Sequence, residues 1–88
     1  MTQADPTAEA RQTAGLLAAI EAMEATLAVA GALAGERRRI DLGGLDAEMG
    51  RLCAAALAAP RAAVPEVRVR LEALVMALDR LRAGLAPP

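Results

Sequence analysis

The feature that most constrains this chain is the spacing of its apolar residues, which recur at alternating intervals of three and four positions. This spacing places one apolar stripe along an α-helix, whereas a half-buried β-strand would alternate every two residues. The pattern occurs in three separate segments. Its positions are Leu16, Ile20, Met23, Leu27, Ala30 and Ala34, then Leu42, Leu45, Met49, Leu52 and Ala56, and finally Val64, Val67, Leu71, Leu74, Leu78, Leu81 and Leu85. The sequence therefore predicts an all-α fold with three helices.

Prolines, glycines and capping residues predict where these helices begin and end. Asp5 is a suitable N-cap with Pro6 at the first helical position, and Gly35 is expected to end the first helix in the left-handed conformation. Asp41 is the predicted N-cap of the second helix, which Pro60 ends. The resulting prediction is one domain over 1–88, with a disordered N-terminus at 1–5, helices at 6–34, 42–59 and 65–83, a corner at 35–41, a link at 60–64 and a tail at 84–88.

The apolar residues are numerous but small, which predicts a thin core. Of the 88 residues, 56% are hydrophobic, many of these are Ala, and none is Phe, Tyr or Trp. Small domains with little core commonly gain stability by oligomerising. The first helix would be about 43 Å long and the other two about 25 Å each. If the long helix packs against an antiparallel hairpin of the other two, about 15 Å of it overhangs, where it either frays before Thr13 or pairs with another chain. We expect a homodimer.

The residue types that are missing exclude most enzymatic chemistry. The chain has no His, Lys or Ser, so the usual imidazole base, zinc ligand and two common nucleophiles are absent. The single Cys53 has no His to activate it and is expected to be a small hydrophobic residue of the second helix. We predict no catalytic residue, no metal, no cofactor and no small-molecule substrate. The bias toward Ala, Arg, Gly and Pro indicates a bacterium with a GC-rich genome.

The segment GERRRIDLGGLD at 35–46 is the most polar feature of the chain. Arg37, Arg38 and Arg39 suit a phosphate or a carboxylate-rich partner. Alternatively, they are solvated cations near the negative end of the first helix, and we prefer this interpretation. The net charge of −1 and the lack of aromatic residues argue against nucleic-acid binding.

The sequence also bears on location. The longest runs without charge, 25–35 and 52–60, are shorter than the roughly 20 apolar residues of a membrane-spanning helix. The N-terminal MTQADPTAEA has no basic region typical of a signal peptide. These observations predict a soluble, cytoplasmic protein.

Taken together, these patterns predict a non-enzymatic protein–protein interaction module, such as an adapter, a small chaperone or a regulatory subunit. It would use Ala/Leu-rich helix faces to bind a second copy of itself, a partner helix, or both. The predicted interface is Leu16, Ile20, Met23, Leu27, Ala30, Gly31 and Ala34, whose last part lies in a small-residue GALAG segment. The alternative is a peripheral membrane protein, which the acidic polar face of the first helix disfavours.

Overall fold

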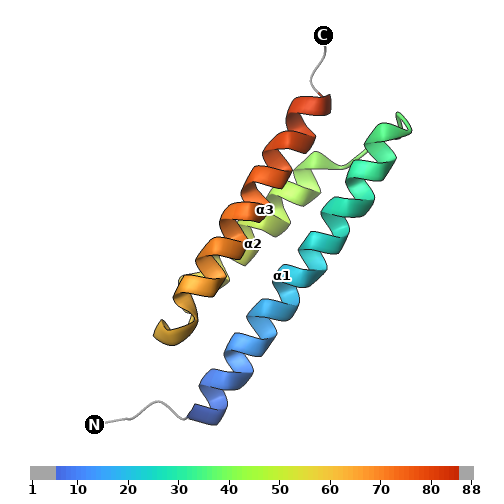
Figure 1. The fold of residues 1–88 in the computed structure, drawn as a ribbon. Coiled ribbons are helices and arrows are strands. Elements are labelled where there is room, and N and C mark those ends of the chain that lie inside the picture. Colours follow the sequence, from blue (N-terminus) through green and yellow to red (C-terminus); the bar gives the residue numbers. More distant parts are fainter. Residues whose placement is uncertain (1–5, 86–88) are drawn as a thin grey trace.

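The computed structural model describes residues 6–85, and the chain folds over this range into a three-helix bundle. The elements are α1 (Pro6–Gly35), α2 (Leu42–Ala56), the short 3-10 helix η1 (Arg61–Ala63) and α3 (Val64–Leu85). Figure 1 shows that α2 returns antiparallel to α1, and that α3 then runs parallel to α1 beside it. The molecule is a rod with principal Cα dimensions of 58 × 18 × 17 Å. The prediction of an all-α bundle, with a long helix against an antiparallel hairpin, is confirmed.

One continuous apolar core joins the three helices, and the predicted stripes supply all of it except Ala63. The buried residues are Leu16, Ile20, Met23, Leu27 and Ala30 of α1, Leu45, Met49 and Leu52 of α2, Ala63 of η1, and Val67, Leu74 and Leu78 of α3. Ile20 is the one side chain among the described residues with no exposed surface. No buried side-chain nitrogen or oxygen within residues 6–85 lacks a hydrogen-bond partner. The core is therefore small and entirely apolar.

The end of α1 differs from the prediction. The left-handed residue is Arg37, with φ of 59°, and no described glycine has a positive φ. Its amide donates to the Ala34 carbonyl at 3.0 Å, and the next amide, of Arg38, donates to the Leu33 carbonyl at 2.9 Å. This pair of bonds is the Schellman motif. The expected left-handed Gly35 was wrong because the helix continues through it and turns two residues later.

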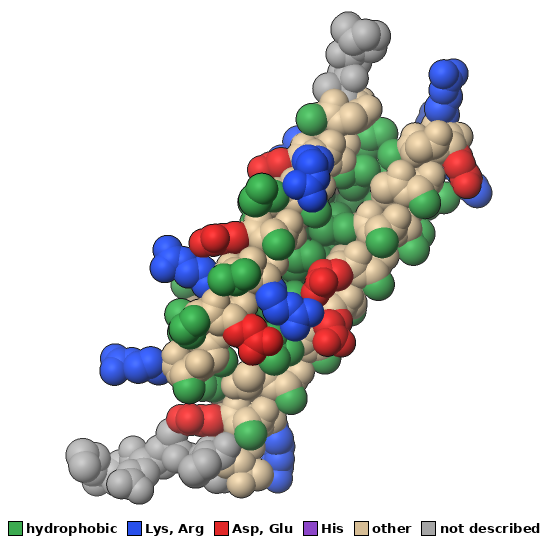
Figure 2. Space-filling view, viewed as in Figure 1, with side chains coloured by type: hydrophobic (Ala, Val, Ile, Leu, Met, Phe, Trp, Pro, Cys, Tyr) green, Lys and Arg blue, Asp and Glu red, His purple; other side chains and the backbone are tan. Residues whose placement is uncertain are grey.

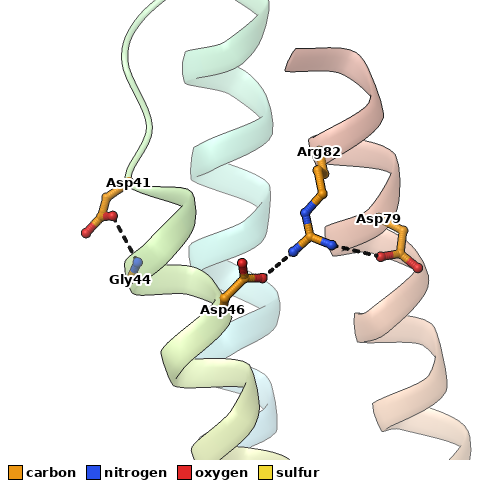
Figure 3. A network of polar contacts seen from close by, with 5 residues as sticks. All are labelled: Asp41, Gly44, Asp46, Asp79 and Arg82. Atoms are coloured by element: carbon orange, nitrogen blue, oxygen red, sulfur yellow. Dashed lines mark hydrogen bonds and ion pairs between the residues drawn. The ribbon is translucent and has the colours of Figure 1, made fainter. Parts of the chain in front are cut away.

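The start of α2 follows the predicted cap, but its end does not. The Asp41 side chain accepts a hydrogen bond from the Gly44 amide at 2.9 Å, as Figure 3 shows. The helix was expected to reach residue 59 but ends at Ala56. The next three amides donate to carbonyls only three residues back, so the backbone tightens into a 3-10-like turn before Pro60. The predicted link over 60–64 contains η1 and the first residue of α3.

Ion pairs and one hydrogen bond tie the helices together at the surface. Arg82 of α3 pairs with Asp46 of α2 and lies 3.6 Å from Asp79 on its own helix (Figure 3). At the other end of the rod, the side-chain amide (Nε2) of Gln12 in α1 donates to the Ala58 carbonyl at 2.5 Å. The predicted overhang of α1 is therefore limited to the turns before Gln12, which are helical from Pro6 onward.

Three predicted features fall partly or wholly beyond the described range. The N-cap Asp5, the disordered segment 1–5 and the last three residues of the predicted tail lie outside residues 6–85. The first two residues of that tail, Gly84 and Leu85, belong to α3.

Candidate functional site

Most of the residues predicted to bind a partner lie inside the bundle. Five of the seven are buried against α2 and α3, namely Leu16, Ile20, Met23, Leu27 and Ala30. The remaining two, Gly31 and Ala34, are exposed and half-buried respectively. The first five are already packed within the chain, so they are inaccessible to a partner while the bundle is closed. The accessible surface therefore begins at the C-terminal part of α1.

A groove runs along the bundle between the C-terminal halves of α1 and α3. We call it the α1/α3 groove, and its volume is about 780 Å³. Its lining is Glu24, Leu27, Ala28, Gly31, Ala34 and Gly35 of α1, with Val69, Arg70, Ala73, Leu74, Ala77, Arg80, Leu81 and Gly84 of α3. Figure 2 shows hydrophobic side chains along this hollow in its upper part and charged side chains at its lower end. The groove is apolar along its length and polar at its ends.

The groove exists because the facing residues of two parallel helices are small. α1 contributes Ala28 and Gly31 to it, and α3 contributes Ala73 and Ala77 at matching heights. A Cβ built on Gly31 would meet no other atom within 4 Å. Small side chains leave the backbone accessible, so another helix can approach closely along such a surface. The taper from leucine and isoleucine to alanine and glycine along α1 therefore produces a concave surface rather than more core.

One end of the groove is closed by ion pairs between α3 and α1. The Arg70 guanidinium lies 2.5 Å from a Glu24 carboxylate oxygen and 4.0 Å from one of Glu21. The hydrogen bond to Glu24 raises the pKa of Arg70 above its ordinary value, and the charges of Glu24, Glu21 and Glu66 act in the same direction. Arg70 therefore stays cationic and links α3 to α1 at this end of the groove.

The opposite end of the groove is basic and has no compensating ion pair. Arg80 lines the groove there, and no ion pair involves its side chain within residues 6–85. Since α1 and α3 are parallel, the connection that carries Arg37, Arg38 and Arg39 follows Gly35 at this same end (Figure 1). All three of these arginines are exposed, and they too form no ion pair in the described part of the chain. The basic end suits a carboxylate-bearing partner.

The residues that bear other chemistry are not assembled into a reactive site. Cys53 is half-buried between α2 and α3. No group of three or more Cys, Asp or Glu side chains able to hold a metal ion occurs within residues 6–85. Gly44 is crowded by the capping carboxylate of Asp41, which is only 2.5 Å from the position of an added Cβ. The glycine pair of the GERRRIDLGGLD segment thus belongs to the start of a helix.

One helix meets the length and composition of a membrane span. Within Thr7–Gly35, an 18-residue window reaches a mean hydropathy of 1.7 with at most two charged residues. The sequence prediction considered only uninterrupted apolar runs and therefore did not detect this property of α1. Long core helices of soluble proteins can have the same composition, but they are mostly buried, whereas 28% of this window is buried inside the bundle.

No protein-family model matches this chain, and comparisons with curated proteins and with solved structures found no match. A function for the chain is therefore argued from its own surfaces. The α1/α3 groove was not predicted from the sequence, because the stripes indicate which faces pack together but not how closely two parallel helices meet. The signal that was available is the coincidence of small residues at equal heights on 28–35 and 73–84.

Proposed function

We propose that this chain is a non-enzymatic protein–protein interaction module, such as an adapter, a small chaperone or a regulatory subunit, that holds one helix of a partner protein. The observation that carries the proposal is the α1/α3 groove, a hollow of about 780 Å³ lined by Gly31, Ala34, Ala73 and Ala77. A helix laid along it would complete a four-helix bundle and bury the apolar floor of the groove.

The charges of the groove indicate the chemistry and direction of the partner helix. Arg80 and the arginines at 37–39 make one end basic, whereas Glu24 and Arg70 neutralise each other at the other end. A partner helix that runs antiparallel to α1 and α3 would place its first turn at the basic end. Acidic residues are favoured in the first turn of a helix because they interact with its dipole. We therefore propose an amphipathic partner helix with small apolar contact residues and an acidic N-terminal turn.

The first experiment fills the groove and compares the variant with a matched change elsewhere on the same helix. Tagged wild-type protein, Gly31→Leu and Gly15→Leu would be used to capture partners from extracts of the native host. Gly15 is also exposed on α1 and has no atom within 4 Å of an added Cβ, but it lies outside the groove. We expect one protein, near equal stoichiometry with the bait, to be retained by wild type and Gly15→Leu and lost from Gly31→Leu. Equal capture by both variants would contradict the proposal.

A charge reversal tests the direction of the bound helix. Arg80→Glu should weaken partner binding, whereas Arg61→Glu should not, because Arg61 lies in η1 at the other end of the rod. Binding that falls equally in both variants would indicate a general charge effect rather than recognition at the basic end of the groove.

A second candidate function is peripheral membrane association, and the hydropathy of α1 is the observation that favours it. The exposed Glu21 and Glu24 on the same helix repel anionic lipid. Cosedimentation with vesicles of phosphatidylglycerol and phosphatidylcholine separates the two candidates. We expect the protein to stay in the supernatant, and sedimentation that Gly31→Leu leaves unchanged would favour the membrane instead.

A further inference from the structure

A second apolar surface lies between α2 and α3, on residues that do not line the α1/α3 groove. We call it the α2/α3 face. It contains an open, shallow hollow of about 630 Å³ whose lining includes Leu57, Val64, Arg68, Glu72, Val75 and Met76. Among the described residues, six large hydrophobic side chains are exposed, and four of them gather here: Leu57 at 91%, Val64 at 44%, Val75 at 40% and Met76 at 58%. Such a concentration of exposed apolar area marks an interaction site.

The charges on this face have an order that is complementary to itself. Along α3, residues at intervals of four run apolar, basic, acidic and apolar, as Val64, Arg68, Glu72 and Met76. Side chains at this interval form one ridge on a helix surface. Arg68 and Glu72 pair with each other at 3.2 Å, and their side chains are 76% and 66% exposed. Both charges therefore remain available to a neighbouring molecule.

If a two-fold axis crosses α3 at the height of residue 70, it brings this series of residues opposite the same series in a second copy, in reverse order. Two antiparallel copies of α3 would place Val64 opposite Met76 of the other copy, and Arg68 opposite Glu72. Each apolar side chain then meets an apolar side chain, and each charge meets its opposite. A parallel pairing would place like charges together, and an unrelated helix would have to present the same order. Isologous contacts of this kind are the commonest form of homo-oligomer interface.

We infer that the α2/α3 face is a homodimer interface, in which α3 of one copy packs antiparallel against α3 of a second copy around residue 70. Leu57, just after the end of α2, lines the same hollow and would lose its exposure when a second copy covers it. The α1/α3 groove shares no lining residue with this face. One dimer would therefore keep both of its partner grooves open, so self-association and partner binding take place on separate surfaces.

The decisive experiment uses two single charge reversals, Arg68→Glu and Glu72→Arg, with native mass spectrometry and sedimentation across a range of concentrations. The wild type is expected to dimerise. Each variant alone brings like charges together in the antiparallel pair, so its dimer dissociation constant should rise at least about tenfold. An equimolar mixture of the two variants restores both opposite-charge contacts and should form a heterodimer, which its mass identifies. The double variant R68E/E72R should form a homodimer again.

Several outcomes would overturn the inference. These are a wild type that stays monomeric at millimolar concentration, single variants that dimerise like the wild type, or a mixture that yields no heterodimer. The chain could also stay monomeric and bind a different protein in host extracts. If Arg68→Glu abolishes that binding, the other protein occupies the face instead of a second copy. Circular dichroism would verify that the variants remain helical, as expected for exposed side chains.

The same variants separate this inference from the proposed function. Gly31→Leu should abolish partner capture and leave the dimer intact, whereas Arg68→Glu should weaken the dimer and leave partner capture intact. A dimer that is lost in Gly31→Leu and kept in Arg68→Glu would place self-association in the α1/α3 groove and refute the assignment of the α2/α3 face.

Discussion

The middle of α1 and its C-terminal end share one apolar spacing but differ in the size of the residues that occupy it. Leu16, Ile20 and Met23 reach across to α2 and α3 and are buried. Ala30 and Ala34 continue the stripe, and Ala34, with Gly31 beside the stripe, borders an open groove between α1 and α3. The comparison separates two properties of an amphipathic helix. Spacing determines which face turns toward its neighbours, and side-chain volume determines whether that face closes into core or remains accessible.

The strongest test of this comparison truncates one leucine-sized residue in each half of the bundle. Ile20→Ala, at a fully buried position, should lower the free energy of unfolding by about 3 kcal/mol. Leu81→Ala, at a half-buried position on the groove, should lower it by about half as much because the side chain is already partly in contact with water. Urea titrations followed by circular dichroism at 222 nm would measure both. Equal losses would mean that the groove is packed like the core.

The next largest change in stability is expected at the C-terminal end of α1, where the helix turns into the connection to α2. Since Arg37 holds the left-handed conformation, Arg37→Gly should raise the free energy of unfolding by about 1 kcal/mol. Gly35→Ala should also stabilise, by about 0.5–1 kcal/mol, because Gly35 is helical and an added Cβ meets no atom within 4 Å. Thermal unfolding would record both changes. A loss of stability in Gly35→Ala would restore Gly35 as the turning residue.

Two glycines of α2 differ in how close other atoms lie to an added Cβ, and replacing them should give smaller changes in stability. Gly50→Ala should stabilise by about 0.5–1 kcal/mol, since nothing lies within 4 Å of the added carbon. Gly44→Ala should change the stability by less than about 0.5 kcal/mol, because the helix propensity gained is offset by displacing the capping carboxylate of Asp41. The same urea titrations apply. A full gain in Gly44→Ala would mean that the cap contributes little.

A small loss of stability is expected at the ion pair that closes the groove. Arg70→Met removes the charge and keeps much of the aliphatic stem, and it should lower the free energy of unfolding by less than about 1 kcal/mol, because the half-buried Arg70 pairs with an exposed Glu24 at the surface. The difference from wild type should shrink further at 1 M salt, where such pairs are screened. If the loss exceeded about 2 kcal/mol or ignored salt, Arg70 would be acting through packing instead.

The sequence was sufficient to predict the helices and the faces that they bury. The stripe of α1 is buried from Leu16 to Ala30, and Asp41 caps α2 as its position before Leu42 indicated. These features depend on local spacing and on the chemistry of single residues, so they can be derived without knowing the neighbours of a helix.

The predictions that failed concern how the chain turns and which positions remain accessible. Leucine at 57 and alanine at 58 and 59 favour helix, yet the chain must reverse direction around Pro60, and that requirement prevails over propensity. Val64 continues the apolar stripe of α3 but is 44% exposed, because α2 ends before it can cover that position. Surfaces of this kind depend on the relative lengths and heights of packed helices, which local patterns do not define.

The short connections at 36–41 and 57–63 also have a consequence for rates. The three helices are joined by short connections, although the most extensive packing is between α1 and α3, and helical bundles of this size generally fold within microseconds to milliseconds. A thin core provides little resistance to unfolding, so we expect the bundle without a partner to unfold and refold often. A partner bound only to the closed form would lengthen the lifetime of that form. The residence time of the partner would then determine how long the chain escapes proteolysis in the cell.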